Sequence, residues 1–286
     1  MNKKKTGRII LSAILAIIIF LILNNIIFSN NNIERLNISE IIYENVEESE
    51  VAQAELKIEV KNAKVPTLMY HSITDDMSYI EYSINAVSPV DFEKQLKYIS
   101  ENGYQTIFFD DLENLGKYTK PIILTFDDGF IDFYKEAFPL LKKYNQKATL
   151  FVVVGYISCD PYCTVEQLKE MEESGLVDVQ VHTQSHKNLT TLNKEDLEKE
   201  VVGSKEILEG YLNKNVTSLC YPYGAYNSTV SNLVSKNYLY AITMDEGCYD
   251  VNLHTYQNIP RYTIPRGISI DKFVNYISKS FVEIKK

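Results

Sequence analysis

The sequence predicts an α/β protein in which helices cover a parallel sheet, preceded by one N-terminal transmembrane helix and a polar stalk. Three observations support this prediction. Short apolar runs alternate with capped, amphipathic segments from residue 65 onward. An apolar run of about 20 residues lies near the start of the chain, and a glutamate-rich stretch separates it from the alternating part. Repeated βα units imply a parallel sheet, either closed as a barrel or doubly wound.

Composition excludes several classes of protein. The 286 residues include 29 Lys and Arg against 38 Asp and Glu, which gives a formal net charge of −9. The proportion of apolar residues is typical of a folded chain rather than a disordered one. The excess of acidic over basic residues argues against a general nucleic-acid binder. The chain has 21 Tyr and 12 Phe but no Trp. We expect no nucleic-acid partner and infer no obligate protein partner.

The N-terminal segment predicts a membrane anchor. Basic residues precede the apolar run at 9–28, which is about long enough to cross ~30 Å of hydrocarbon. They favour a cytoplasmic N-terminus and an extracytoplasmic remainder. A cleaved signal peptide would have a shorter apolar stretch and a small-x-small cleavage site. We therefore expect residues 1–29 to form a single-pass anchor in the cell membrane, with secretion after signal cleavage as the alternative.

The next segment predicts a stalk. Residues 30–64 are polar and rich in acid, with eight glutamates, so we expect them to bury little surface. We place the domain boundary near Lys64–Pro66, which leaves residues 65–286 as the folded domain.

Within that domain, capping signals locate the helices. Ser88 and Pro89 occupy the N-cap and first helical positions, and Gly103 marks the end of the helix. Thr164 with Gln167 forms a second capping box. The expected helices are residues 88–103, 132–144, 164–175, 193–212, 227–236 and 271–280. The expected strands are residues 65–71, 121–127, 148–154, 177–182, 216–221, 238–243 and 259–264.

Polar residues follow the carboxyl ends of five of these strands. They are His71, Asp127, Asp128, His182, Tyr223 and Asp245. In a βα barrel such strand ends converge on the face where the enzyme's chemistry takes place. Doubly wound sheets also bind ligands at strand carboxyl ends, so this pattern alone does not choose between the two folds.

Two of these strand ends together predict a metal site. Asp127 and Asp128 close a strand that contains no charge, and His182 and His186 lie four residues apart. Two histidines and one carboxylate can hold a divalent ion and leave positions open for water and substrate. The second carboxylate can act as a general base on water whose pKa the ion lowers. Either motif alone is more often an ordinary turn or a pair of unrelated histidines.

The same motifs resemble those of the polysaccharide deacetylases of carbohydrate esterase family 4, which share the NodB homology domain. Residues 125–129, T-F-D-D-G, are similar to the first family motif, and residues 182–186, H-T-Q-S-H, to the second. Residues 221–224, Y-P-Y-G, resemble the third. The resemblance covers roughly residues 65–281 and implies an irregular (β/α) barrel of NodB type with a catalytic domain at 65–286.

The resemblance also implies roles for individual residues. Asp127 would be the catalytic base, and Asp128, His182 and His186 would bind the metal, with zinc expected and cobalt or nickel as alternatives. The backbone N–H of Tyr223 would help to bind the developing oxyanion. Substrate-binding residues are expected around the third and fourth motifs: Tyr221, Pro222, Tyr223, Asp245 and Tyr249.

The chain departs from the common family pattern at three places. Leu219, Cys220 and Tyr221 stand where the third motif usually carries an arginine that orients the catalytic aspartate. In the fourth motif Asp245 resembles the usual acid, but Tyr249 is the nearest aromatic where a tryptophan is usual. The fifth motif, Leu-x-His, which supplies the general acid, has no obvious match near the C-terminus.

A branch of the family accounts for most of these departures. The poly-N-acetylglucosamine deacetylases look circularly permuted, and residues 69–73, M-Y-H-S-I, resemble their early histidine motif. His71 would then protonate the leaving amine, although a structural strand-end histidine is the alternative. Pro260 and Arg261 resemble that branch's Pro-Arg pair, so Arg261 could supply the missing guanidinium, with Arg266 as the less favoured candidate. His254 has no family role, and we expect a solvated loop histidine.

The cysteines leave alternatives open. An exported domain permits a disulfide between Cys159 and Cys163. Zinc ligation by these two cysteines would need partners that their loop does not show. Cys220 and Cys248 could pair across the barrel rim or remain buried thiols.

The resemblance implies metal-dependent hydrolysis of acetamide groups on an N-acetylated cell-surface glycan such as poly-N-acetylglucosamine or peptidoglycan. The alternatives are an O-acetyl polysaccharide esterase and a catalytically weak glycan-binding domain. Because tryptophan is absent, Tyr223, Tyr226 and Tyr249 are the candidates for stacking on sugar.

Overall fold

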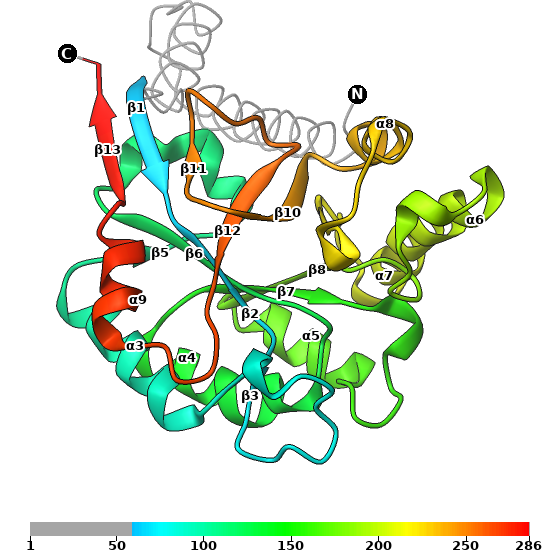
Figure 1. The fold of residues 1–286 in the computed structure, drawn as a ribbon, viewed down its shortest axis with the longest axis horizontal. Helices are drawn as coiled ribbons and strands as arrows, with labels where there is room; N and C mark the ends of the chain where they lie inside the picture. The colour runs from blue at the N-terminus through cyan, green and yellow to red at the C-terminus, as the bar shows by residue number, and fades with distance from the viewer. Residues whose placement is uncertain (1–58, 286) are drawn as a thin grey trace, which may run out of the picture. The chain divides into compact units, whose positions relative to one another are not determined.

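The computed structural model describes residues 59–285 (Figure 1). The expected anchor at residues 9–28 lies outside the described residues, as does all of the expected stalk before residue 59. Within 59–285, no helix combines the length and the apolar character that crossing a membrane requires.

Seven parallel strands close into a barrel. Their order is β2-β12-β10-β9-β8-β7-β6, and β2 pairs again with β6 to complete the ring. The strands are β2 (Thr67–Tyr70), β6 (Pro121–Phe126), β7 (Ala148–Val152), β8 (Val177–Val181), β9 (Ser218–Cys220), β10 (Tyr240–Glu246) and β12 (Ile259–Thr263). A further short strand, β5 (Gln105–Thr106), adds to β6. The barrel alternative is therefore confirmed and the doubly wound one is wrong.

The barrel is irregular, as expected. Strands β8 and β9 share a single paired position, Val181 with Leu219, and the register between β10 and β12 shifts between Ile242 and Glu246.

Helices follow the predicted capping signals. Ser88 accepts a hydrogen bond from the N–H of Asp91, and Thr164 and Gln167 form the expected reciprocal pair. The helix predicted at 193–212 is interrupted by a π-helical segment, Lys199–Gly203. The α-helices of the described residues are α3 (Pro89–Glu101), α4 (Phe138–Tyr144), α5 (Val165–Glu173), α6 (Lys194–Glu198), α7 (Ser204–Leu212), α8 (Ser228–Asn237) and α9 (Ile270–Ile277).

The barrel lies between two apolar cores, because the side chains of its strands alternate between the two faces. On β6, Leu124 and Phe126 belong to the core between the barrel and its helices. Ile123 belongs to a second core inside the barrel. Thr125 and Asp127 continue this inner row toward the carboxyl end of the strand. The polar side chains of Thr125 and Asp127 therefore lie directly above the inner apolar core.

A small antiparallel sheet, which the sequence analysis did not predict, contains β11 (Tyr249–Asp250), β1 (Val60–Val65) and β13 (Phe281–Ile284) (Figure 1). The expected stalk boundary is therefore wrong by about five residues, since Ala63 and Val65 are fully buried in the inner core. Lys61 and Asn62 are adjacent polar residues at a register shift in β1, so this strand lacks a regular apolar and polar alternation. A second small sheet pairs β3 (Ser72–Ile73) with β4 (Ala86–Val87).

Candidate active site and metal centre

A cavity of about 400 Å³ opens at the carboxyl ends of the barrel strands. Six of the residues singled out from the sequence line it: His71, Asp127, Asp128, His182, His186 and Tyr223. They come from the ends of β2, β6 and β8 and from the turn after β9. Barrel closure therefore gathers residues that are up to 152 positions apart in the sequence (71 to 223).

Asp127 lies in the floor of this cavity and is paired with Arg261. The carboxylate accepts two parallel hydrogen bonds, from Nη1 to Oδ1 and from Nη2 to Oδ2, both at 2.8 Å. Both side chains are almost completely buried. Burial alone would raise the pKa of Asp127, but the adjacent guanidinium outweighs burial and holds this pKa well below its usual range.

Arg261 is itself fully satisfied. Besides the two bonds to Asp127, its Nε donates to the carbonyl oxygen of Thr243 at 2.9 Å and Nη1 donates to Oγ1 of Thr125 at 3.0 Å. Nη2 also approaches Sγ of Cys220 at 3.1 Å. These contacts use all five N–H donors of a guanidinium. Arg261 therefore occupies the position that the sequence analysis assigned to it, whereas Arg266 lies elsewhere.

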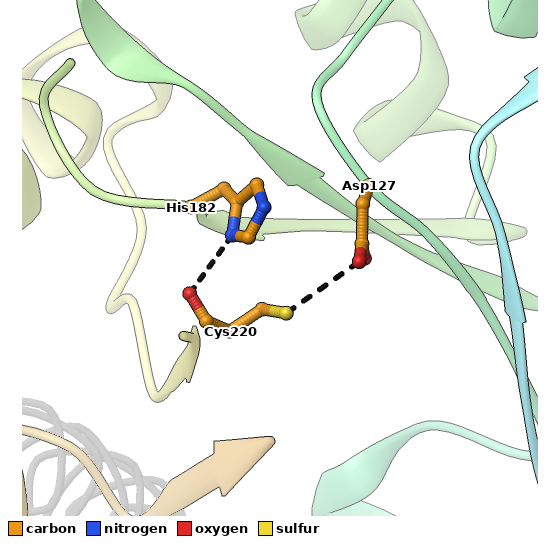
Figure 2. A group of neighbouring side chains, drawn as sticks. All are labelled: Asp127, His182 and Cys220. Atoms are coloured by element: carbon orange, nitrogen blue, oxygen red, sulfur yellow. Dashed lines mark hydrogen bonds between the residues drawn. The ribbon is translucent and has the colours of Figure 1, made fainter. Parts of the chain in front are cut away.

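Cys220 lies between Asp127 and His182 and contacts both (Figure 2). Its Sγ lies 3.6 Å from Oδ2 of Asp127, and its backbone oxygen lies 2.8 Å from Nδ1 of His182. Because a carbonyl oxygen can only accept, Nδ1 of His182 must carry the proton, and Nε2 is left as a lone-pair donor. Burial raises the pKa of the Cys220 thiol well above its ordinary value, so this group is neutral.

Asp128, His182 and His186 form a set of three potential metal ligands. Oδ1 of Asp128 lies 3.7 Å from Nε2 of His182 and 3.5 Å from Nε2 of His186. One ligand atom from each residue falls within 4.8 Å of the others. Two imidazole nitrogens and one carboxylate oxygen suit a divalent ion such as zinc. The fixed tautomer of His182 presents an unprotonated nitrogen to this point, so the residues present fit the metal.

The electrostatics of Asp128 agree with this fit. Burial and the neighbouring Asp127 raise the pKa of Asp128 to about 7. Without a cation, this carboxylate therefore faces a neighbouring negative charge that Arg261 only partly offsets. A divalent ion between Asp128 and the histidines would remove this cost.

A second group, Asp127, His182 and Cys220, also brings three ligand atoms within 4.8 Å. This group does not fit a cation. Both oxygens of Asp127 already bind the Arg261 guanidinium, and the Cys220 thiol is protonated. A cation placed there would lie beside a buried positive charge.

His71 follows β2 and lines the same cavity. Burial lowers the pKa of His71, and the nearby Asp127 carboxylate opposes this effect only in part. The imidazole is therefore mainly neutral at pH 7 in the metal-free protein.

Tyr223 lines the cavity beside His186. Its side chain is 63% exposed, and its ring lies 4.7 Å from the ring of His186. The backbone adopts φ 59°, ψ 12°, which is unusual for a bulky residue. Hydrogen bonds from Gly224 to Tyr221 and from Ala225 to Pro222 hold this turn.

Four of the expected substrate-binding residues are not brought into the cavity lining. Tyr221 is fully buried, because Cys220 faces the barrel interior and the next residue must face the helices. Pro222 is buried as well. Asp245 is exposed and accepts a hydrogen bond from Tyr226 at 3.4 Å. These three residues shape or flank the rim rather than line the cavity.

Tyr249 is the clearest correction. It lies in β11, is 3% exposed, and packs in the inner core 6.2 Å from Tyr256. It pairs with Val65 of β1, so it cannot stack on a sugar in the cavity. His254 accepts a hydrogen bond from the N–H of Asp250 and packs on Tyr249. His254 therefore lies beside β11 and is not among the residues that line the cavity.

Several residues of the cavity were missed in the sequence. Ile80, Glu81, Tyr82 and Asn85 come from the connection between β3 and β4, and Ser72, Phe130 and Met244 complete the lining. The length of that connection was the available signal, since long irregular loops in compact domains are often functional. Arg266 joins the two ends of this connection by donating to the carbonyl oxygens of Thr74 and Ala86.

All four cysteines are free thiols in the described residues. Cys163 is buried and donates to the carbonyl oxygen of Phe130 at 3.3 Å, while Cys159 is exposed. The structure therefore has neither of the disulfides that the sequence permits.

Comparisons with known proteins agree with this architecture. The family model for polysaccharide deacetylases matches residues 116–242. The chain is 33% identical over 223 residues to YxkH of Bacillus subtilis (strain 168), whose name describes a polysaccharide deacetylase; the match covers 76% of this chain and 77% of that protein. It is 29% identical over 212 residues to a poly-beta-1,6-N-acetyl-D-glucosamine N-deacetylase of Staphylococcus aureus (strain MRSA252), covering 68% and 71% of the two chains. The structure of the Streptococcus pyogenes deacetylase PplD in complex with acetate matches with a TM-score of 0.69 and 30% identity, over 75% of this chain and 98% of that one.

Proposed function

The chain belongs to the polysaccharide deacetylase family, and from this premise we propose that it is a metal-dependent N-deacetylase of a cell-surface polysaccharide that contains N-acetylglucosamine. The observation that carries the proposal is the shared cavity. A three-residue metal set, an ionised carboxylate and a histidine line one space of about 400 Å³. These are the groups that hydrolysis of an unactivated amide needs.

Asp128, His182 and His186 would hold the metal, with zinc preferred and cobalt or nickel as alternatives. When bound, the ion would supply a Lewis acid that activates water and polarises the acetamide carbonyl.

Proton transfer is assigned to Asp127 and His71. Because Arg261 keeps Asp127 ionised at neutral pH, a carboxylate oxygen is available to accept a proton from the attacking water. His71 would deliver a proton to the leaving nitrogen, and its neutral resting form means that it must first take one up. The backbone N–H of Tyr223 would donate to the carbonyl oxygen as negative charge develops there. Arg261 acts through Asp127 and is a positioning residue.

The cavity walls support a neutral sugar polymer as the substrate. Tyr82 and Tyr223 are largely exposed and offer flat faces with polar ends. Among residues 59–285, neither lysine nor arginine lines the cavity, so nothing there recruits an anionic glycan. Together with the named activity of the staphylococcal relative, this favours β-1,6-linked poly-N-acetylglucosamine over peptidoglycan.

The location of the enzyme is part of the proposal. The apolar run at residues 9–28 and the basic residues before it would anchor the chain in the cell membrane with the catalytic domain outside the cytoplasm. This position would place the site beside its polymer.

The test is to incubate the zinc-loaded full-length chain with β-1,6- and β-1,4-linked N-acetylglucosamine oligomers and with O-acetylated xylo-oligosaccharides. Acetate and free amine are measured together. We expect equal amounts of both products, with the β-1,6 series fastest. Acetate without amine would indicate an esterase, and binding without acetate would indicate a glycan-binding domain; either result would overturn the proposal.

A further inference from the structure

The segment from His182 to His186 adopts a strained conformation. Thr183 has φ 66° and His186 has φ 56°. Positive φ is rare outside glycine, above all for a β-branched residue such as threonine, and each such residue costs roughly 1–3 kcal/mol unless its surroundings hold it. Two of the five residues in the proposed metal-binding segment are therefore in a conformation that the chain would not adopt by itself.

Glu200 holds this segment from one side. It belongs to the π-helical segment Lys199–Gly203 and is buried. Its Oε2 accepts hydrogen bonds from the backbone N–H groups of Gln184 at 3.0 Å and Ser185 at 2.8 Å. Its Oε1 accepts a hydrogen bond from the Ser185 hydroxyl. One carboxylate thus binds three donors between the two histidines without touching either histidine.

The exit of β7 holds the segment from the other side. The N–H of Val154 donates to the carbonyl oxygen of Thr183 at 3.0 Å, and the N–H of Gly155 donates to that of Gln184 at 2.8 Å. A Cβ on Gly155 would lie 2.5 Å from the Gln184 oxygen, closer than real Cβ contacts allow. Glycine at 155 is required by this close approach.

We propose that Glu200 is a positioning residue for the metal centre and that Gly155, in the turn after β7, is its counterpart. Together they fix the strained segment so that Nε2 of both histidines faces Asp128 before a cation arrives. The affinity for the ion then depends on two residues that do not contact it. This inference rests on the proposed metal site but not on the proposed substrate.

Metal affinity of the full-length chain provides the test, with zinc alone as the probe in calorimetry and cobalt alone as a spectroscopic probe. We expect Glu200→Ala to weaken zinc binding about 10- to 100-fold, the usual range for groups that orient metal ligands, and to change the visible spectrum of bound cobalt. Glu200→Gln should recover most of the affinity, because one amide oxygen can accept both N–H bonds. Gly155→Ala should weaken binding in the same direction.

Glu198→Ala is the matched control, since Glu198 is the last residue of α6, directly before the π-helical segment, and is exposed. Parental zinc affinity in both Glu200→Ala and Gly155→Ala would overturn the proposal, whatever their melting temperatures. If Glu200→Ala does not fold, Gly155→Ala and Ser185→Ala decide the question, and parental affinity in both overturns the proposal. A parent chain that binds neither metal overturns this proposal and the metal centre together. A parent that binds zinc but releases no acetate overturns only the proposed substrate chemistry.

Discussion

Asp127 and Asp128 are neighbours in the chain but belong to two different regions of the site. Asp127 points into the barrel floor, where Arg261 satisfies both of its oxygens and Cys220 lies alongside. Asp128 points to the cavity, where its Oδ1 lies 3.7 Å from Nε2 of His182 and 3.5 Å from Nε2 of His186. The negative charge of Asp127 is thus balanced by the Arg261 guanidinium, whereas no lysine or arginine among the described residues lines the cavity beside Asp128.

This difference shows how one dipeptide can serve two purposes. Asp128 has φ 75°, which turns the backbone after the strand so that consecutive side chains do not share one environment. The guanidinium lowers one carboxyl pKa, while burial and the adjacent acid raise the other to about 7. Two carboxyl groups at one site whose pKa values differ in this way typically have different roles in catalysis.

The largest effect is expected from Asp127→Asn. Loss of a general base typically costs about 10²- to 10⁴-fold in rate, because an amide cannot accept the proton. The ligands Asp128, His182 and His186 are unchanged, so zinc content should stay near that of the parent. Acetate release and zinc content are measured on the same sample. Turnover equal to the parent would remove Asp127 from its role.

Arg261→Met tests whether the stability of the fold depends on the buried ion pair between Arg261 and Asp127. Removing one partner of a buried ion pair typically lowers the free energy of unfolding by about 3–5 kcal/mol, since Asp127 would be left buried and uncompensated. Chemical denaturation measures this loss. The control is Asp127→Asn combined with Arg261→Met, in which the stranded charge is gone; it should unfold less easily than Arg261→Met alone. An equal loss in both would show that packing, rather than charge, matters here.

Asp128→Asn should act in the opposite direction on the metal-free protein. A carboxyl pKa raised to about 7 means that the folded state holds its proton more tightly than the unfolded chain. Stability is then full below pH about 4 and falls as the pH rises toward 7. At pH 8 the metal-free variant should be more stable than the metal-free parent by on the order of 2–4 kcal/mol. Thermal melts from pH 4 to 8 test this, and the variant should also lose the stabilisation that zinc gives the parent. A parent without this pH dependence would contradict the comparison.

The smallest effect is expected from Cys220→Ser. A hydroxyl can accept from Arg261 and donate to Asp127 much as the thiol does, so the free energy of unfolding should change by about 1 kcal/mol or less. Acetate release should stay within severalfold of the parent. Cys248→Ser is the matched control, because Cys248 donates only to a backbone oxygen. A loss comparable to that of Arg261→Met would mean that the thiol, not the guanidinium, holds Asp127.

Local patterns were enough to predict the barrel strands, the capped helices and the clustering of Asp127, Asp128, His182 and His186. Each follows from residues close together in the sequence: an apolar run that ends in two acids, two histidines four apart, or a serine before a proline. Periodicity and capping act over a few residues, so they can be read without the fold.

Closure of the barrel decided the rest. The pairing of Arg261 with Asp127 spans 134 residues and depends on β12 reaching β2. Strand alternation, fixed by that closure, placed Cys220 inside and Tyr221 outside. Pairing of β11 with β1 placed Tyr249 in the inner core. The connection that carries Tyr82 was marked in the sequence only by its length. Glu200 and the strand at Val60–Val65 have no local signal of their function, because each acts on a segment that only the folded chain brings to it.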